Sequence, residues 1–333
     1  MSALKIAIVT TLRDAGPMLD SFVTYHLRNG FARLYLFFDD PADPDLARLA
    51  GHPMVSAIAH DEVLRERWAR LPEYAIYGAH IGREVMARQV LNVALAQDLA
   101  RQDGCDWLLH IDSDELFFAP KQAVAAHFLE VNALPVDTVC YRNFEAVPEK
   151  ADIIDPFREV DLFKVPPELG AGPFDRNGYA LLANTPQIPQ KRFHFYRNGK
   201  AAVRLGARDM RPGGVHRFGR PGGTTNEAQA TDAFVLHYPC CGFDAFWQKY
   251  KTLGVFGDIW LGTFDIRQAI GPLHLDARDM VAGNDREAAL AFYRQRIAIE
   301  DKTRAEQLIR HGILTRFAQP RDFLDRQAPS AGG

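Results

Sequence analysis

Short apolar runs alternate with helically spaced segments over the first 60 residues. Lys5–Thr11 and Arg33–Phe38 are typical of strands buried on both faces, and Val55–Ala59 is a third such run. Met18–Asn29 has apolar residues three and four positions apart, and Gly30 suits the position just after a helix. This alternation predicts an α/β fold with a doubly wound, mostly parallel sheet.

Further strands and helices are predicted from the same two patterns, continuous apolar runs and apolar residues three and four positions apart. Apolar spacing predicts a long helix at Ile81–Gln102, followed by another wholly apolar strand at Trp107–Ile111. Pro and Gly are frequent in residues 148–221, where pieces such as Arg192–Tyr196 are short, so we expect an irregular region there and no second sheet of the same type. Helices are also predicted at Asp45–Ala50, Gln122–Val131, Phe243–Leu253 and, long and amphipathic, Asp285–Gly312; strands are predicted at Thr138–Asn143 and, as the last strand, Phe234–His237.

The composition is that of an ordinary globular protein. The 333 residues carry a net charge of −3 and are 47% hydrophobic, which excludes disordered, collagen-like and coiled-coil classes and argues against a nucleic-acid partner. No run approaches the roughly 18 apolar residues of a membrane span, and the N-terminal run is too short for a signal peptide. We expect a cytoplasmic protein and leave peripheral membrane association and oligomeric state open.

None of the four cysteines forms a CxxC pair, so zinc-ribbon and thioredoxin-type sites are not expected. Cys240 and Cys241 are adjacent, and two adjacent thiols rarely form a relaxed disulfide. We expect them to be reduced and partly buried.

Three acids follow the apolar strand Trp107–Ile111. Asp112 and Asp114 are alternate residues around Ser113, so both carboxylates can reach one divalent cation at the carboxyl edge of the sheet. Such an ion would neutralise a diphosphate leaving group. The alternatives are an acidic strand end exposed to water, or a phosphatase of the haloacid-dehalogenase type, which normally has Thr or Val where Glu115 stands.

Two other strand ends carry polar residues. Thr10, Thr11 and Arg13 follow the first strand and suit a nucleobase, a ribose and a phosphate; the alternative is a capped loop with a surface arginine. Asp39 and Asp40 end the second strand, where an acid commonly accepts ribose hydrogen bonds. Neither GxGxxG near the first strand nor GxxxxGK[ST] occurs, which disfavours nicotinamide dehydrogenases and P-loop enzymes.

Two histidines could belong to a site. His216 lies in GGVHRF, and His237 ends a strand that precedes a helix with Lys249 and Lys251. A neutral imidazole of His237 could complete a metal shell, and the lysines could contact phosphate. A structural role in the core is the alternative for either histidine.

Several motifs, taken in the order in which they occur along the chain, resemble those of the family 92-like and family 2-like glycosyltransferases of the GT-A fold. The resemblance covers roughly residues 3–257. It is carried by TTLRD, FFDD, a helix with Arg83, Arg88, Gln89 and Asn92, and then WLLHIDSDELF, CYRNF, GKAAVR, GGVHRF and VLHYPCCGFDAFWQKYKTLG.

The resemblance implies transfer of a sugar, of the hexosyl type, from a nucleotide-sugar donor such as a UDP-sugar. It implies Mn²⁺ or Mg²⁺ as cofactor, inversion at the anomeric carbon, and a hydroxyl acceptor on a glycan or cell-surface polysaccharide. Matched position by position, Asp112 and Asp114 are the DxD ligands of metal and ribose-diphosphate, and His237 is the late histidine that can join the metal. Four further residues match the donor pocket: Thr11, Arg13, Asp40 and Arg88. Ser113, between the two DxD acids, is a further candidate contact to the donor.

An inverting displacement needs a carboxylate base for the acceptor hydroxyl. Glu145 and Asp258 are the candidates, and the position of Glu145 after strand Thr138–Asn143 favours it slightly. We expect a transferase domain over residues 1–260, with a donor half at 1–118 and an acceptor side at 119–260, and a helical extension over 261–333. The alternatives are a metal-dependent phosphoesterase or nucleotidyltransferase, and a sugar-binding protein without catalysis.

Overall fold

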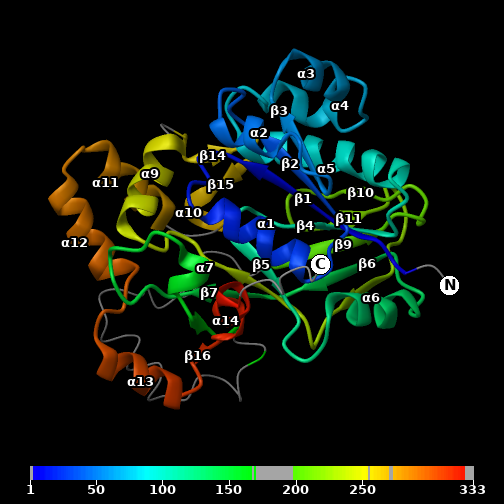
Figure 1. The fold of residues 1–333 in the computed structure, drawn as a ribbon. Coiled ribbons are helices and arrows are strands. Elements are labelled where there is room, and N and C mark those ends of the chain that lie inside the picture. The colour runs from blue at the N-terminus through cyan, green and yellow to red at the C-terminus, as the bar shows by residue number, and fades with distance from the viewer. Residues whose placement is uncertain (1–2, 167–168, 170–197, 254–255, 270–272, 327–333) are drawn as a thin grey trace. The chain divides into compact units, whose positions relative to one another are not determined.

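The chain forms two compact units. The computed structural model describes residues 3–166, 169, 198–253, 256–269 and 273–326 (Figure 1). Unit 1 comprises Met1–Asn143 and Asn198–Val235, and unit 2 comprises Phe144–Arg197 and Leu236–Gly333. The boundaries at 118/119 and 260/261 are functional divisions and stay predictions.

Unit 1 is built on a seven-stranded sheet in the order β12–β6–β9–β4–β1–β2–β3. Strands β3, β2, β1 and β4 are parallel, β9 is antiparallel to its neighbours β4 and β6, and β12 is parallel to β6. The predicted α/β class with a mostly parallel sheet is therefore confirmed. The strands are β1 (Ile6–Leu12), β2 (Arg33–Phe38), β3 (Val55–Ala59), β4 (Trp107–His110), β6 (Thr138–Tyr141), β9 (Lys200–Arg204) and β12 (Glu227–Gln229).

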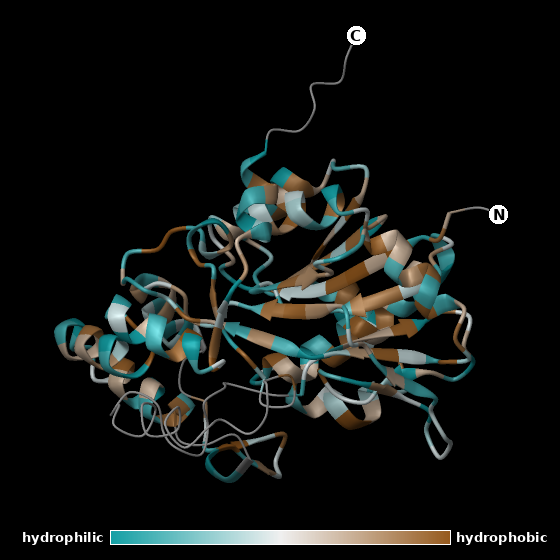
Figure 2. Ribbon diagram, turned by 90° about the horizontal axis from the view of Figure 1, so that it is seen from below, coloured by the Kyte–Doolittle hydropathy of each residue, from teal (hydrophilic) through white to brown (hydrophobic). Residues whose placement is uncertain are grey.

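Helices flank this sheet, and local polar groups define their ends. Every residue of β1 is buried, and Figure 2 shows the apolar central strands beside helices that carry both hydrophobic and hydrophilic residues. The Asp61 carboxylate accepts a hydrogen bond from the Leu64 amide at the start of α3, and Gly30, with φ of +100°, follows α1 as predicted. The elements are α1 (Met18–Arg28), α2 (Pro44–Leu49), α3 (Glu62–Trp68), α4 (Tyr74–Tyr77), the 3₁₀ helix η1 (Gly78–His80), α5 (Val85–Gln102), α6 (Val124–Asn132), β5 (Glu115–Phe118), β10 (Arg211–Pro212) and β11 (Phe218–Gly219).

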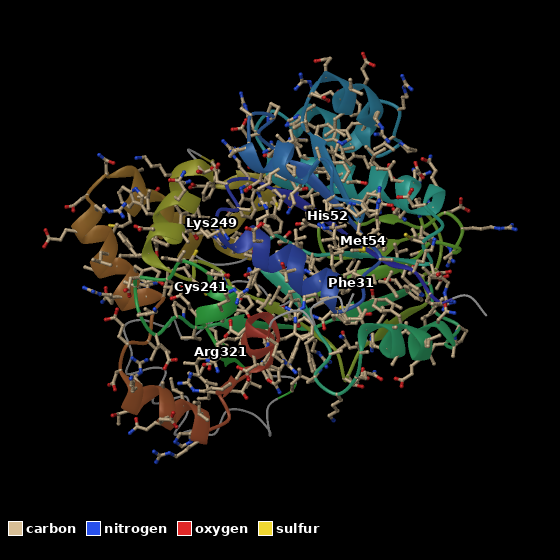
Figure 3. All side chains as sticks on the ribbon, in the orientation of Figure 1. Phe31, His52, Met54, Cys241, Lys249 and Arg321 are labelled. Atoms are coloured by element: carbon tan, nitrogen blue, oxygen red, sulfur yellow. The ribbon has the colours of Figure 1, made fainter. Side chains whose placement is uncertain are left out.

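An aromatic cluster anchors α1 to β5 in unit 1. Phe31, labelled in Figure 3, lies edge-on to His26 and Phe117, at ring-centroid distances of 5.5 and 5.6 Å. His26 Nδ1 donates to the Phe22 carbonyl, and Nε2 accepts from the Phe117 amide. Burial lowers the pKa of His26 to about 3, so the ring is neutral and serves the core.

Unit 2 contains a smaller sheet and most of the C-terminal helices. Its strands follow the order β16–β8–β7–β13, and β8 is antiparallel to β7 and β16. Helices α9, α11 and α12 share a core that includes Phe246, Ala277 and Tyr293. The elements are β7 (Asn143–Ala146), α7 (Pro156–Glu159), β8 (Leu162–Lys164), β13 (Phe234–His237), α9 (Phe243–Leu253), β14 (Ile259–Trp260), β15 (Phe264–Asp265), α10 (Ile266–Ala269), α11 (Leu273–Ala282), α12 (Arg286–Arg296), α13 (Lys302–Arg310), β16 (Leu314–Arg316) and α14 (Gln319–Asp325).

The structure bears on two further features of the sequence, the cysteines and the lengths of the apolar helices. All four cysteines are buried and none forms a disulfide, as expected for Cys240 and Cys241. Within the described residues, no helix is both long enough and apolar enough to cross a bilayer.

Several predicted bounds are confirmed and others are wrong. The predicted limits of β2, β3, β13 and α9 are those observed. The helix expected from Ile81 begins at Val85, because the 3₁₀ helix η1 and a turn over residues 81–83 precede it. The strand predicted at Thr138–Asn143 is divided at Arg142 into β6 and β7, and Phe234–His237 is not the last strand, since β14 to β16 follow.

The Pro- and Gly-rich region was predicted wrongly in one respect that matters. It was expected to be irregular, yet β9 comes from it and lies inside the main sheet between β4 and β6. The piece Arg192–Tyr196 lies outside the described residues.

The long helix predicted over Asp285–Gly312 is two helices, α12 and α13. The chain leaves the helical conformation at Ile297, with φ of −122° and ψ of −55°. Ala298 and Ile299 are buried within the break, so the apolar spacing continues across it. The Asp301 carboxylate then accepts a hydrogen bond from the Arg304 amide, 3.2 Å away, and starts α13.

Asp301→Ala should lower the free energy of unfolding by about 0.5–2 kcal/mol, because it leaves the first amides of α13 without their cap. Urea denaturation followed by circular dichroism measures this loss. Glu306→Ala, an exposed substitution within the same helix, is the control and should change stability by less than about 0.5 kcal/mol. Equal effects of the two substitutions would contradict the capping role.

Candidate active site

The acids predicted from the sequence lie at the carboxyl edge of the unit 1 sheet. β4 runs parallel to β1, with His110 opposite Val9, so Asp112 leaves the sheet beside the end of β1. The side chain of Asp112 is 27% exposed, whereas that of Glu115 is fully buried. Glu115 Oε2 accepts a hydrogen bond from the Asp112 amide at 2.7 Å. The third acid therefore shapes the turn, and Asp112 faces outward.

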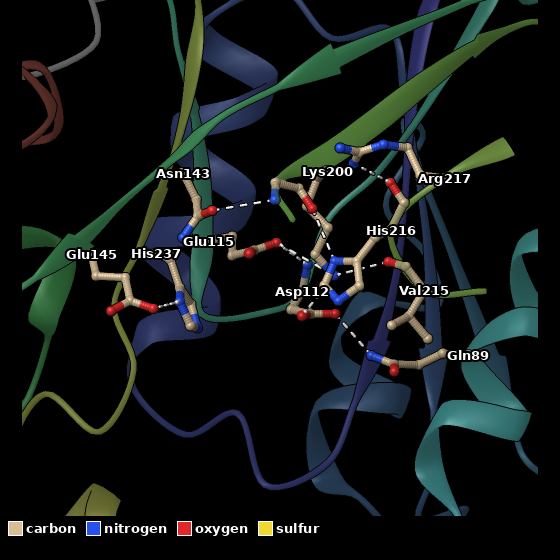
Figure 4. Close-up of polar contacts among 11 residues, drawn as sticks. Gln89, Asp112, Glu115, Asn143, Glu145, Lys200, Val215, His216, Arg217 and His237 are labelled. Carbon is tan, nitrogen blue, oxygen red and sulfur yellow. Dashed lines mark hydrogen bonds and ion pairs between the residues drawn. The ribbon is translucent and has the colours of Figure 1, made fainter. Parts of the chain in front are cut away.

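A buried lysine that the sequence analysis did not assign to the site holds Asp112. Lys200 begins β9, its side chain is fully buried, and its Nζ lies 2.8 Å from Asp112 Oδ2. Nζ also lies 3.8 Å from Glu115 Oε2 and donates to the Val215 carbonyl at 3.3 Å (Figure 4). Burial favours the neutral amine, yet Asp112 and Glu115 outweigh it and raise the pKa of Lys200 above its ordinary value. Lys200 is thus a permanent internal cation.

Asp112 accepts a second hydrogen bond from α5. Gln89 Nε2 donates to Asp112 Oδ1 at 2.8 Å (Figure 4). Burial disfavours the charged form of Asp112, but Lys200 keeps the pKa of this carboxyl below its usual value. Asp112 is therefore an ionised carboxylate with a fixed orientation.

A polar relay beneath the site links α5 to β1. Asn92 Nδ2 donates to Thr11 Oγ1 at 2.9 Å, and Asn92 Oδ1 accepts from Trp68 Nε1 at 3.1 Å. Both Asn92 and Thr11 are buried. This relay fixes the end of β1, where Thr11 was predicted to meet the donor.

Two neutral histidines lie close to Lys200. His216 Nδ1 is 2.9 Å from the Gly199 carbonyl, which can only accept, so Nδ1 carries the proton. Burial, and then Lys200, lower the pKa of His216 to about 4 and that of His110 to about 3. Within the described part of the chain, the buried Nε2 of His110 has no hydrogen-bond partner. Neither histidine adds positive charge at neutral pH.

Gly199 makes the approach of Lys200 possible. Its φ is +65°, and a Cβ there would lie 2.1 Å from the Tyr141 carbonyl oxygen. The Gly199 amide donates to Asn143 Oδ1 at 3.2 Å. Only glycine fits without strain at this close approach of the start of β9 to the end of β6.

The acids at the end of β2 have separate roles. Asp39, not the predicted Asp40, is buried and forms a two-pronged ion pair with Arg88, with Nε–Oδ1 at 2.6 Å. Arg88 also donates to the Ile81 carbonyl at 2.7 Å. Asp40 is exposed and accepts from the Ala42 amide. The guanidinium of Arg88 is therefore already matched by Asp39, and its donor role stays a prediction.

The other predicted donor residues of unit 1 lie near the same edge with different exposure. Thr10 is fully buried, and its Oγ1 has no partner among the described residues. Arg13 is exposed, and Ser113 and Asp114 are partly exposed. Their contact with a donor stays a prediction.

Unit 2 holds the remaining predicted residues. Glu145 is fully buried; its Oε2 lies 3.4 Å from Lys164 Nζ, and its Oε1 lies 3.6 Å from His237 Nδ1 (Figure 4). Asp258 is 66% exposed and pairs with Arg278 at 2.8 Å. Two predicted phosphate contacts lie on α9: Lys249, labelled in Figure 3, is partly exposed, and Lys251 is exposed with its Nζ 5.8 Å from the centre of the Trp247 ring.

The described residues do not fit a divalent ion bound by side chains alone. They contain no group of three or more His, Cys, Asp or Glu side chains placed to hold a metal. A cation drawn to Asp112 would lie against the Lys200 ammonium, and like charges repel strongly in a buried setting. The metal roles of Asp112, Asp114 and His237 stay predictions, and no step of the mechanism is assigned to Mn²⁺ or Mg²⁺.

The chain is similar to two curated Arabidopsis thaliana proteins. It is 28% identical to glycosyltransferase-like At2g41451, over 95% of this chain and 71% of the relative. It is 27% identical to glycosyltransferase-like At3g57200, over 95% of this chain and 62% of the relative. The chain thus spans less than two thirds of the second protein's length. No protein-family model matches the chain.

Two solved structures are distantly similar to the chain. A putative nucleotide-diphospho-sugar transferase from Desulfovibrio desulfuricans G20 is 11% identical with a TM-score of 0.30, over 84% of this chain and 98% of that one. Mouse xyloside xylosyltransferase 1 is 14% identical with a TM-score of 0.28, over 61% of this chain and 66% of that one.

Two residues of the unit 1 site, Lys200 and Gln89, lie in motifs of the resemblance but had no individual role in the sequence analysis. Asp39 was named with Asp40 at the end of the second strand, and only Asp40 was matched to the donor pocket. Lys200 had a readable signal, because a lysine that opens an apolar strand directly after a glycine has few ways to reach water. Nothing in the sequence separates Asp39 from Asp40 or distinguishes Gln89 within its helix, since such polar residues are common on surfaces.

Gly199→Ala should lower the free energy of unfolding by more than about 2 kcal/mol, because the new Cβ collides with backbone and the residue has a positive φ. Gly206→Ala is the matched control, since it lies after the other end of β9 with open space around its Cβ. Thermal and urea unfolding of both variants measure the difference. If Gly199→Ala is as stable as the control, residue 199 does not lie as close to the Tyr141 carbonyl as described.

Proposed function

We propose that this protein is a glycosyltransferase that moves a sugar from a nucleotide-sugar donor, a UDP-sugar, to an acceptor hydroxyl. The observation that carries the proposal is Asp112, a partly exposed carboxylate held ionised by Lys200 and Gln89. It lies at the carboxyl edge of parallel strands, where α/β folds bind nucleotides. The similarity to two proteins named glycosyltransferase-like supports the same class.

Donor binding would use Asp112 as a hydrogen-bond acceptor. An ionised carboxylate with a fixed orientation accepts strong hydrogen bonds from ribose or sugar hydroxyls. Thr11, fixed by Asn92 at the end of the neighbouring strand, would lie beside the same ligand. These residues bind and orient the donor and need no rearrangement of buried charge.

Transfer with inversion needs a base that takes the proton of the acceptor hydroxyl. Burial supports Asp258 as the base, whereas position in the sequence favoured Glu145 slightly. Glu145 has no exposed surface and lies against Lys164, whereas Asp258 is 66% exposed. An acceptor on a glycan can reach an exposed carboxylate directly, so we assign the base to Asp258 and a structural role to Glu145.

The donor class can be tested by hydrolysis of a panel of UDP- and GDP-sugars. We expect slow release of UDP from a UDP-sugar, and Asp112→Asn should lower kcat/KM at least about tenfold, because it removes the charged acceptor. Asp98→Asn, an exposed acid on α5, should leave kcat/KM unchanged.

Other outcomes distinguish the alternatives. Turnover of p-nitrophenyl phosphate, with no release of nucleotide from any sugar donor, would show a phosphoesterase. A thermal shift with free sugar and none with UDP or GDP would show a sugar-binding protein.

Asp258→Asn should slow sugar transfer by about a hundredfold or more while leaving UDP affinity and melting temperature unchanged, since the amide cannot take a proton. Glu145→Gln should instead lower the free energy of unfolding by about 1–3 kcal/mol, because Lys164 loses a buried counter-charge. The rates of sugar transfer by the two variants are compared at equal concentrations of folded protein. A loss of chemistry in Glu145→Gln alone would return the role of base to Glu145.

A further inference from the structure

We infer that the Lys200 ammonium is the built-in cation of the donor site, so that nucleotide binds there without a divalent metal and Asp112 recognises hydroxyl groups. The part about nucleotide rests on the proposed function. The part about the cation rests on side-chain geometry within unit 1 alone.

The surroundings of Nζ are those of a bound cation. Asp112 Oδ2 lies at 2.8 Å, the Val215 carbonyl at 3.3 Å and Glu115 Oε2 at 3.8 Å. Carboxylate and carbonyl oxygens are the ligands that hard divalent cations take in proteins. Here an ammonium, with three N–H donors, lies among them.

The protein cannot easily release this cation. Lys200 and Glu115 are both fully buried, and a buried charge that loses one of its partners in a medium of low polarity loses much of its stabilisation. The absence of a Cβ at Gly199 allows the start of β9 to lie close to the Tyr141 carbonyl. We therefore expect Lys200 to stay beside Asp112 when a ligand binds.

This arrangement decides what Asp112 can bind. Its Oδ2 faces Lys200 and its Oδ1 receives Gln89, and each carboxylate oxygen has a second lone pair. The exposed part of a carboxylate repels phosphate and accepts from a hydroxyl. The ligand group that fits is a sugar or ribose hydroxyl. Because Lys200 has no exposed surface, it is a positioning residue that acts through Asp112.

A titration with Mn²⁺ alone tests the cation, without nucleotide and without activity. The wild-type protein should show no Mn²⁺ binding tighter than about 1 mM that depends on Asp112. Lys200→Met removes the ammonium and leaves Asp112 and Glu115 together, so it should bind Mn²⁺ at least about tenfold more tightly. The double variant Lys200→Met, Asp112→Asn should lose that binding again.

Lys164→Met is the matched control, because it removes another lysine that is paired with a buried carboxylate. It should leave Mn²⁺ binding as in the wild type. If Lys200→Met does not fold, comparing Mn²⁺ binding by the wild type and by Asp112→Asn still shows whether Asp112 holds a metal ion. Tight Mn²⁺ binding by the wild type that Asp112→Asn abolishes would overturn the inference.

Calorimetry with UDP and GDP, in EDTA and then in Mn²⁺, tests the consequence for the donor. We expect the Kd to differ by less than about threefold between the two conditions, whereas tightening by more than about tenfold that depends on Asp112 would overturn the inference. If neither nucleotide binds in either condition, the proposed function fails, and the Mn²⁺ titration still decides the role of Lys200.

Discussion

The buried ion pair between Lys200 and Asp112 is the constraint on which the unit 1 site depends. It joins two segments 88 positions apart in the sequence, and it exists because β9 is inserted antiparallel between β4 and β6. In an antiparallel pair, the first residue of one strand lies where the other strand ends. Ala202 lies opposite Leu109, so Lys200 arrives at the carboxyl end of β4, where Asp112 begins the turn. If β9 ran parallel, its lysine would lie at the opposite edge of the sheet.

One internal positive charge also sets the state of its neighbours. Lys200 favours the ionised form of Asp112 and helps to keep His110 and His216 neutral. A neutral His216 can donate from Nδ1 to the Gly199 carbonyl, which holds the residue next to Lys200 in place. The charges at this edge therefore depend on buried groups, which salt screens far less than exposed ones. A site of this kind holds its charge distribution before any ligand arrives, which is the requirement for electrostatic preorganisation.

The sequence predicts the local elements of unit 1 well and its non-local contacts poorly. Buried strands such as Arg33–Phe38 are visible as apolar runs, and Asp112 is visible because it follows such a run. The position of β9 is not visible, because the choice of neighbours in a sheet depends on pairings between residues far apart in the sequence, such as Tyr141 with Lys200 and Trp107 with Arg204. The break between α12 and α13 is hidden for another reason: Ala298 and Ile299 are apolar and buried within the break, so the apolar spacing continues as it would in one helix. Which of Asp39 and Asp40 pairs with Arg88 also depends on packing, since the two acids are equivalent in the sequence.

Each unit buries a glutamate near a lysine, and the two arrangements differ in which carboxylate a ligand can reach. In unit 1, Lys200 contacts both the buried Glu115 and the partly exposed Asp112, so the internal cation stabilises a carboxylate that a ligand can reach. In unit 2, Lys164 lies against Glu145, whose charge has no exposed surface. A partly exposed carboxylate such as Asp112 can bind hydroxyl groups at little cost, because its desolvation has already been compensated during folding. A fully buried carboxylate such as Glu145 would have to leave its lysine and reach the surface before it could take a proton from an acceptor. This difference is the reason why we propose the exposed Asp258, and not Glu145, as the base; Glu145 and Lys164 lie opposite each other in β7 and β8.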